Sequence, residues 1–224
     1  MSDIKSNLSS IEQQISKACE AVNRSKSEVT LLAVSKTKPV ELIEQAYQQG
    51  QKHFGENYLQ EAVEKITQLS ALKDISWHFI GPIQSNKTND IAKHFLWVHS
   101  VDRIKIAKRL NDHRSSQDTP LNVCLQVNIS EESTKSGVLE KDINELALYI
   151  SECPYLVFRG IMAIPEKNAP KSTYQKMHQL FSELQTRYST VDTLSMGMSN
   201  DLTQAIASGS TMVRIGTALF GARN

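Results

Sequence analysis

Short apolar runs alternate with amphipathic segments along almost the whole chain. The runs are rich in β-branched or aromatic residues, a composition that favours buried strands. They lie near residues 30–35, 53–55, 76–80, 96–99, 121–128, 156–161, 191–195 and 211–215. Between them, apolar residues recur at spacings of three and four, which is the periodicity of a helix with one buried face. The pattern therefore predicts eight strands, each followed by a helix.

One more helix is predicted ahead of this series. Apolar residues recur from Ile4 to Val22 at helical spacing, so residues 3–23 read as an opening helix. Later in the chain, Asp102 stands just before a helical pattern that starts at Ile104, and we expect its side chain to cap that helix.

Alternating strands and helices predict a parallel sheet with right-handed crossovers. Eight strands is the number that closes a TIM (β/α)₈ barrel, whereas doubly wound sheets usually have fewer strands and rank second. No linker, tandem repeat or low-complexity tract divides the sequence. We therefore expect an α/β fold with one domain over residues 1–224.

Composition narrows the class of protein. The net charge of +1 gives no reason to expect nucleic acid or an anionic membrane as a partner. No apolar stretch approaches the length of a membrane span. Three widely spaced cysteines predict reduced thiols in a cytoplasmic protein rather than disulfides or a zinc site. The six histidines include no helical i, i+4 pair, so no metal site is predicted.

Lys36 closes the first predicted strand, and a helix is predicted just after it. An amine at the exit of a buried strand is partly desolvated, which lowers its pKa and frees its lone pair to attack a carbonyl. The alternative is an ordinary solvated lysine at a strand end. In a barrel the distinction matters, because active sites lie at the C-terminal ends of the strands.

The last two strands lead into loops that suit an anion. Gly197 and Ser199 follow strand seven, while Gly216 and Thr217 follow strand eight. In this fold, phosphate commonly binds at these two loops, where glycine admits a close backbone approach and hydroxyls add donors. Both glycines could instead be turn glycines. Arg214 shares the face of Gly216, although it could be part of a structural ion pair.

Other polar or adaptable residues stand in the predicted strands or at their ends: Asn57, His78, Asn128 and Met162. His78 suits a hydrogen-bonded core residue as well as it suits a ligand contact. Asp192 and Asp201 suit turn and cap positions better than a catalytic pair. A nucleophilic amine combined with a phosphate cradle suggests pyridoxal 5'-phosphate (PLP) as the ligand.

The chain resembles the pyridoxal phosphate homeostasis protein family, relatives of the N-terminal barrel of alanine racemase. The resemblance covers essentially the whole chain and is carried by LLAVSKTKP (31–39), FGENYLQE (54–61), WHFIGPIQSNK (77–87), RGIMAIP (159–165), LSMGMSNDL (194–202) and STMVRIGTALFG (210–221). The resemblance implies a single-domain TIM barrel that holds PLP as a Schiff base on Lys36. It also implies further PLP-binding residues: Asn57 beside the ring, Met162 in the pocket, Arg214 at the pyridine nitrogen, and Ser199, Gly216 and Thr217 at the phosphate. From its place in strand three, His78 is added as a candidate PLP contact.

Members of this family are regarded as carriers or regulators of vitamin B6 that also affect amino-acid and keto-acid pools. An arginine cannot take the proton of the pyridine nitrogen, so the cofactor should be a weak electron sink. Racemisation also needs a second base on the opposite face, which the racemase relatives take from a second domain, and here the sequence stops at Asn224.

We therefore expect a non-catalytic, monomeric carrier that serves PLP-dependent apo-enzymes. The alternatives are an amino-acid racemase or similar enzyme using Lys36 as base, an aldolase-like barrel, and a barrel with an unrelated ligand.

Overall fold

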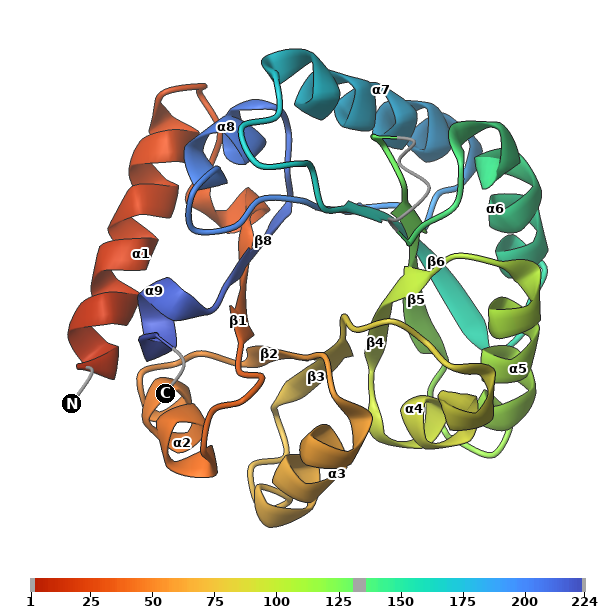
Figure 1. Ribbon diagram of the computed structural model, residues 1–224, viewed down its shortest axis with the longest axis horizontal. Coiled ribbons are helices and arrows are strands. Elements are labelled where there is room, and N and C mark those ends of the chain that lie inside the picture. Colours follow the sequence, from red (N-terminus) through yellow and green to blue (C-terminus); the bar gives the residue numbers. More distant parts are fainter. Residues whose placement is uncertain (1–2, 131–135, 223–224) are drawn as a thin grey trace.

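Eight parallel strands form one closed barrel in chain order, so that each strand pairs with the next and β8 pairs with β1 (Figure 1). The computed structural model describes residues 3–130 and 136–222. The strands are β1 (Thr30–Val34), β2 (His53–Glu56), β3 (Ser76–Phe79), β4 (Trp97–Val101), β5 (Leu121–Val127), β6 (Leu156–Ala163), β7 (Thr193–Ser195) and β8 (Met212–Ile215). All of them fall in or beside the runs predicted from the sequence, and the predicted (β/α)₈ barrel is confirmed.

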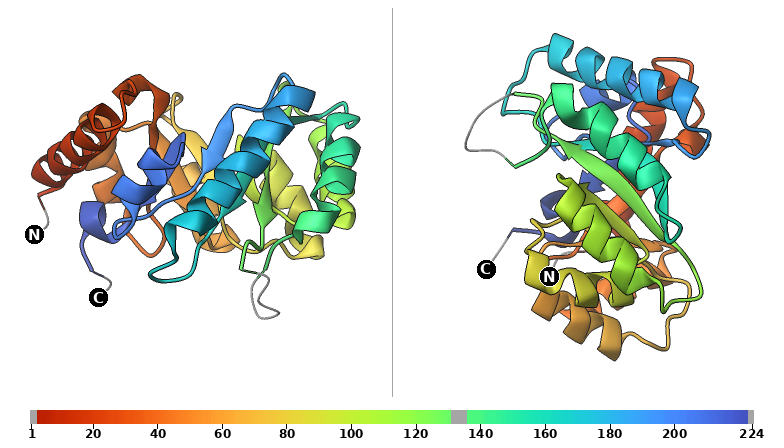
Figure 2. Two further views of the ribbon diagram at one scale, coloured as in Figure 1. Left: turned by 90° about the horizontal axis from the view of Figure 1, so that it is seen from above. Right: turned by 90° about the vertical axis from the view of Figure 1, so that its right-hand side faces the viewer.

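The helices lie on the outer side of the strands, as both views in Figure 2 show. They are α1 (Ile4–Glu20), α2 (Val40–Gln48), α3 (Leu59–Gln68), α4 (Thr88–His94), α5 (Ile104–Arg114), α6 (Ile143–Ser151), α7 (Lys171–Arg187), α8 (Leu202–Ala207) and α9 (Thr217–Phe220). Short 3-10 helices span Lys26–Glu28, Ser85–Lys87 and Glu140–Asp142. Within the described ranges, no helix has both the length and the apolar character needed to cross a bilayer.

The predicted opening helix is α1, and it completes the outer layer where the barrel closes. The Asp3 side chain accepts the backbone N–H of Ser6 at 3.2 Å and so caps the helix start. The helix α9 that follows β8 has only four residues and cannot cover β8 and β1 by itself. Helix α1 packs against α2, α8 and α9, and Asn7 Nδ2 donates to the Leu219 carbonyl at 2.8 Å. The first and last helices therefore cover the seam together.

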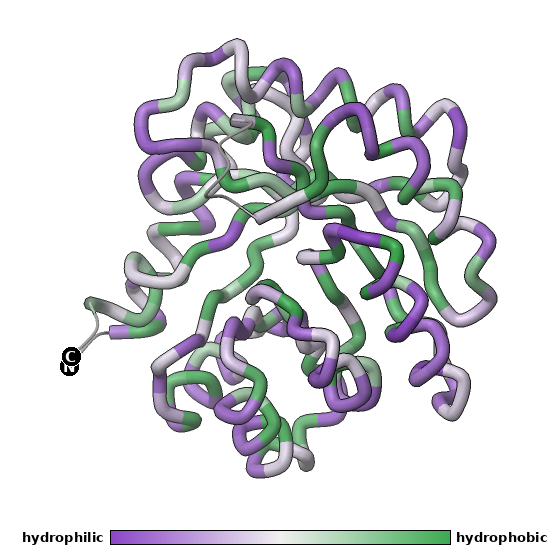
Figure 3. Tube along the Cα trace, turned by 45° about the vertical axis from the view of Figure 1, so that its right-hand side comes forward, coloured by the Kyte–Doolittle hydropathy of each residue, from purple (hydrophilic) through white to green (hydrophobic). Residues whose placement is uncertain are grey.

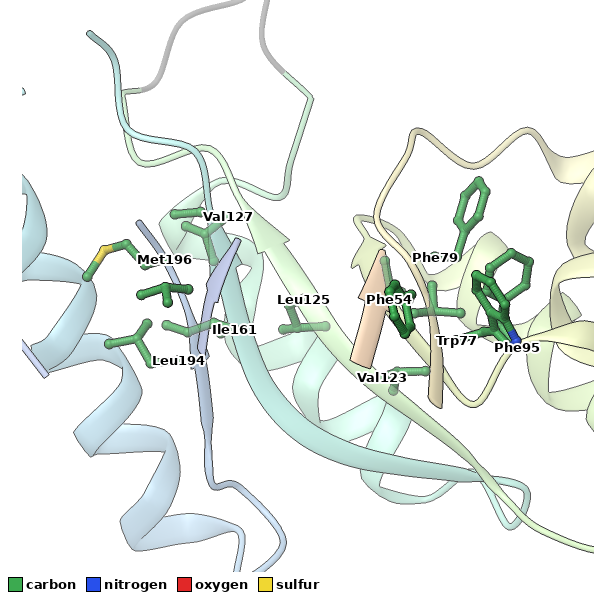
Figure 4. Packing of buried hydrophobic residues seen from close by; sticks show 14 of the residues in the cluster. Phe54, Trp77, Phe79, Phe95, Val123, Leu125, Val127, Ile161, Leu194 and Met196 are labelled. Carbon is green, nitrogen blue, oxygen red and sulfur yellow. The ribbon is translucent and has the colours of Figure 1, made fainter. Parts of the chain in front are cut away.

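The main hydrophobic core lies between the strands and the helices. Phe54 and Trp77 meet with ring centroids 5.8 Å apart, and Phe79 and Phe95 meet at 5.3 Å (Figure 4). Burial of each such side chain contributes about 1.5–3 kcal/mol. Along the trace, the helices change repeatedly between hydrophilic and hydrophobic residues (Figure 3), as expected for helices with one buried face.

The inside of the barrel is a different environment. Successive side chains of a strand point to opposite faces, so every second residue faces inward. Some inward residues are apolar and buried but do not belong to the outer core, as with Leu32, Cys124, Met162 and Met212. Others are polar, and they determine the site described below.

One local prediction is wrong. Asp102 does not cap α5, because the N-cap position is occupied by Arg103 and no side chain caps that helix start. The Asp102 carboxylate instead accepts a hydrogen bond from Arg103 Nη1 at 2.6 Å. One residue of displacement from the cap position is enough to prevent the side chain from reaching the free N–H groups.

Candidate functional site

Lys36 lies at the C-terminal rim of the barrel, just past β1. The preceding residue, Ser35, points outward, because its hydroxyl donates to Glu56 Oε1 at 2.6 Å on the helix side of β2. Lys36 is the next residue and lies in the turn after β1, which is closed by the Lys38 N–H donating to the Ser35 carbonyl at 3.0 Å. Lys36 is half-buried. Its backbone therefore lies at the barrel mouth, as expected for a residue at the C-terminal end of β1.

A buried ion cluster holds the backbone on one side of Lys36. Lys65 of α3 donates to the Ser35 carbonyl at 2.7 Å and to Glu56 Oε1 at 2.8 Å. Glu56 is fully buried, and burial raises the pKa of its carboxyl group, opposed by the attraction of Lys65. Because Lys65 bonds the carbonyl that immediately precedes Lys36, the cluster fixes the direction in which the chain leaves β1.

The other side of Lys36 is held as well. Thr37 adopts the left-handed conformation with φ of 61°, which a threonine occupies only when its surroundings hold it there. Its N–H donates to Glu61 Oε1 at 2.5 Å, and the same oxygen accepts from Lys65 Nζ at 2.5 Å. Lys36 therefore stands between two anchored peptide groups on a rigid rim.

The exit of β8 lies directly beside that of β1. Ala33 pairs with Ile215, and a Cβ added to Gly216 would lie 3.2 Å from the Val34 carbonyl oxygen. Glycine at this position lets the two strand ends approach closely. Thr217 is exposed and opens α9, where the first backbone N–H groups have no intrahelical acceptor.

The loop after β7 is fixed by Gly197 and Asp201. Gly197 has φ of 101°, and a Cβ there would lie 2.5 Å from the Cβ of Ala205 in α8. The Asp201 carboxylate does not cap α8 through its side chain; it accepts the Met198 N–H and the Tyr174 hydroxyl, both at 2.7 Å. Asp192, the other predicted turn residue, forms an ion pair with Arg159. The loop presents the exposed Ser199 on the rim next to the exit of β8.

Arg214 of β8 is a buried cation inside the barrel. Its Nη1 donates to the Ser195 carbonyl at 2.7 Å and to Ser195 Oγ at 2.9 Å, and its Nη2 donates to the Ala163 carbonyl at 2.8 Å. Among the described residues no carboxylate forms an ion pair with it, and burial lowers the pKa of the guanidinium to about 10. Nε–H and one Nη2–H make no bond within the described part of the chain, so they remain as donors for a ligand.

Asn57 and Met162 also lie near the mouth. Asn57 follows β2 and lines a cavity of about 500 Å³ formed by the ends of β2, β3, β5 and β6. Its Oδ1 is buried and has no hydrogen-bond partner among the described residues. Asn128, which follows β5, lines the same cavity. Met162 of β6 is buried and in register with Ser195 of β7, and β7 lies between β6 and the strand of Arg214, β8.

His78 lies deeper than a rim residue. Its ring is fully buried, and both of its nitrogens bond to other histidines, His53 at 3.0 Å and His99 at 2.9 Å. Of the two roles that its place in strand three left open, this position favours the hydrogen-bonded core residue over the direct ligand contact. The sequence reading also missed His99, Ser195 and Lys65. These residues could have been singled out in the sequence, because each is a polar residue within a predicted strand or on the apolar face of a predicted helix.

Comparisons with known proteins identify the family. The family model described as "Alanine racemase, N-terminal domain" matches residues 6–224. The chain is 51% identical to the pyridoxal phosphate homeostasis protein of Escherichia coli over 233 residues, which cover 100% of this chain and 98% of that protein. The chain belongs to the pyridoxal phosphate homeostasis protein family. The protein of that name from Pseudomonas aeruginosa is 50% identical over 228 residues, covering 100% and 97% of the two chains.

Solved structures agree with this membership. PipY from Synechococcus elongatus, solved with PLP bound, superposes with a TM-score of 0.85 at 33% identity, covering 98% of this chain and 100% of that one. Alanine racemase from Streptomyces coelicolor superposes with a TM-score of 0.76 at 14% identity, covering 98% of this chain and 58% of that one. The second likeness establishes a shared barrel fold alone, as predicted from the sequence.

Proposed function

We propose that this protein binds pyridoxal 5'-phosphate through a covalent link to the Lys36 amine and acts as a carrier in vitamin B6 homeostasis. It stores or delivers the cofactor and thereby influences amino-acid and keto-acid pools. The observation that carries the proposal is the position of Lys36 after β1, next to the anchored Ser35 carbonyl and the β8 exit at Gly216, in a chain half identical to pyridoxal phosphate homeostasis proteins.

The residues present fit the ligand at each end. Among the described residues, Arg214 keeps two N–H donors for an acceptor such as a pyridine nitrogen, and Asn57 Oδ1 has no donor and can accept a hydrogen bond near the mouth. We assign the phosphate to the rim formed by Ser199, Gly216 and Thr217, where hydroxyls and a glycine that admits close approach lie on neighbouring strand exits. Met162 lines the pocket in this assignment, and His78 supports it from below.

The neighbourhood of Arg214 favours a carrier over an enzyme. PLP supplies an aldehyde that condenses with amines and a ring that withdraws electrons when its nitrogen is protonated. Arg214 is a donor, and no carboxylate pairs with it among the described residues, so nothing at this position holds a proton on the ring nitrogen. The site therefore suits retention of the aldehyde better than carbanion chemistry.

Reductive trapping tests the covalent link. Protein loaded with PLP is treated with borohydride and digested, and we expect the ligand on the peptide that contains Lys36. Lys36→Ala should lose the trapped adduct while retaining weaker, phosphate-dependent binding. Lys38→Ala is the matched control, because the Lys38 amine donates to the Ala222 carbonyl on the surface and should leave trapping unchanged. Trapping on another lysine in the wild-type protein would refute the assignment.

A second experiment separates the carrier from the racemase alternative. The loaded protein is incubated with L-alanine or L-serine in deuterated water, and the α-carbon is followed by NMR. A carrier should incorporate solvent deuterium no faster than free PLP does. Substantial turnover that disappears in Lys36→Ala would establish an enzyme instead.

The proposal includes the protein's setting. We take residues 1–224 as one PLP-binding domain that works as a monomer, delivers the cofactor to apo-enzymes and resides in the cytoplasm. Free thiols at Cys19, Cys124 and Cys153 support the location, since an oxidising compartment would favour their pairing. Sedimentation of the loaded protein tests the monomer, and transfer of PLP to an added apo-enzyme tests delivery.

A further inference from the structure

A continuous row of polar side chains crosses the inside of the barrel from the start of β2 to Arg214. His53 Nδ1 lies 3.0 Å from His78 Nε2, and His78 Nδ1 lies 2.9 Å from His99 Nε2. His99 Nδ1 lies 3.1 Å from Ser195 Oγ, which accepts from Arg214 Nη1 at 2.9 Å. We call these five residues the histidine row. Its first four residues lie on β2, β3, β4 and β7, and the fifth, Arg214, lies on β8 beneath the barrel mouth.

The row is buried over most of its length. His78, His99 and Ser195 have no exposed surface, and only His53 is half-buried at the far end. Trp97 stacks on His78 with ring centroids 5.2 Å apart, which closes one side of the row. Burial lowers the pKa of His53, His78 and His99, and the positive charge of Arg214 further lowers that of His99. All three rings are therefore neutral at physiological pH.

Neutral rings give the row a definite direction. A guanidinium can only donate, so Ser195 Oγ accepts from Arg214. The Ser195 hydroxyl proton then goes to His99 Nδ1, which leaves the His99 proton on Nε2 facing His78 Nδ1. By the same step His78 carries its proton on Nε2, facing His53 Nδ1. Each hydrogen bond of the row is thus donated by the residue nearer to Arg214 and accepted by the next residue toward His53.

The opposite direction is disfavoured. If His99 donated from Nδ1 to Ser195 Oγ, the buried Ser195 hydroxyl proton would have no acceptor among the described residues, whose other contact with that oxygen is the donor Arg214. A buried donor without a partner is unfavourable. The contacts therefore select a single tautomer for each ring.

We infer that Ser195, His99 and His78 are positioning residues for the ligand contact of Arg214. In this arrangement the carbonyl and the hydroxyl oxygen of Ser195 accept both Nη1 hydrogens. These neutral acceptors compensate the buried charge of Arg214 without a carboxylate. The guanidinium consequently keeps one orientation, with Nε–H and one Nη2–H available to a pyridine nitrogen that accepts and carries no proton. This inference rests on the proposed function for the identity of the ligand. The direction of hydrogen-bond donation along the row is independent of that function.

The direction is tested on ligand-free protein. Two-bond ¹H–¹⁵N spectra of ¹⁵N-histidine-labelled protein near pH 7.5 should show His78 and His99 with the proton on Nε2. Ser195→Ala removes the donor to His99 Nδ1 and should shift that nitrogen's resonance while leaving the half-buried His113 of the outer helix α5 unchanged. Wild-type His99 protonated on Nδ1 would overturn the inference, whatever the protein's behaviour with PLP.

The positioning role is tested with two replacements at one position. The amide of His99→Asn lies close to the place of Nδ1 and can still bond Ser195, whereas the amide of His99→Gln lies close to the place of Nε2 and loses Ser195. We expect Ser195→Ala and His99→Gln to weaken PLP binding about tenfold and to shift the visible band of the bound cofactor. His99→Asn should stay within about twofold of the wild type.

A purely structural role predicts a different result. Equal thermal destabilisation of His99→Asn and His99→Gln, with an unchanged band and affinity in both, would refute positioning. Ser195→Ala removes one oxygen only and serves as the measurement if the histidine variants do not fold. Failure of the proposed function is distinguishable, because it would appear as absence of trapping on Lys36 in the wild-type protein.

Discussion

The two sides of the barrel mouth hold the two basic residues of the proposed site by opposite means. On the β1–β2 side, Lys36 is braced from behind by Glu56, Glu61 and Lys65, a cluster of full charges outside the strands. On the β7–β8 side, Arg214 is held inside the barrel by carbonyls and one hydroxyl, none of them charged.

The difference shows that charged side chains can fix the backbone of a site from outside the barrel without entering the site. The carboxylates of the ion cluster fix the end of β1 from the outer side of the strands, while Arg214, inside the barrel, meets only neutral acceptors among the described residues. A carboxylate inside would offer the ring nitrogen a partner that keeps its proton, and the proposed carrier avoids this arrangement. The geometry of the rim and the electrostatics of its interior are thus set by separate groups of residues.

The largest expected effect comes from breaking the ion cluster. Lys65→Met leaves Glu56 buried without its cation, and removing one member of a buried pair costs about 3–5 kcal/mol. Urea unfolding of the ligand-free protein measures the loss.

The double variant Glu56→Gln with Lys65→Met should recover much of the lost free energy of unfolding, because no uncompensated charge remains. Glu61→Gln, at the partly exposed edge of the cluster, should cost about 1 kcal/mol or less. A loss below 1 kcal/mol in Lys65→Met would contradict the comparison.

The second largest effect is expected from acid, because the buried, neutral histidines of the histidine row make the folded protein less stable as the pH falls. The pKa of His99 falls to about 3 in the folded protein, and that of His78 falls well below its ordinary value. Between the ordinary pKa of about 6.5 and the lowered values, the unfolded chain binds protons that the folded chain does not. Stability is therefore fully present above about pH 6.5 and is lost as the pH falls below it. Each buried histidine removes up to about 1.4 kcal/mol per pH unit.

The acid effect is measured by urea unfolding between pH 7.5 and 5. His78→Gln should reduce the slope by the share of one histidine. A slope identical to that of the wild type would show that His78 is protonated in the folded state.

The smallest effect concerns the link between the cation and the row. Arg214→Gln removes the positive charge that lowers the pKa of His99, so the pKa of His99 should rise. NMR titration of the labelled ring detects this change. The accompanying loss of stability should be about 1–3 kcal/mol, since one or more of the Ser195 and Ala163 acceptors loses its donor. An unchanged His99 titration would mean that the cation and the row are electrostatically independent.

The sequence was sufficient for the order of the elements and for the residues on the rim. Hydrophobic periodicity predicted every strand, and the positions of Lys36, Ser199, Gly216 and Thr217 at strand ends followed from the barrel topology. The supports were not predictable in the same way. Whether His99 meets Ser195, or Lys65 reaches the Ser35 carbonyl, depends on the register of strands that are distant in the sequence. Asp102 failed as a cap for a similar reason, since a shift of one residue decides the outcome.

The pairing of β8 with β1 has a consequence for biosynthesis. Thr30 to Ala33 are among the first strand residues to be made, yet their partners Met212 to Ile215 come near the end of the sequence. Lys36 and the Gly216 backbone consequently become neighbours only after β8 has been made. A growing polypeptide that has not yet reached β8 therefore lacks one half of the proposed binding site.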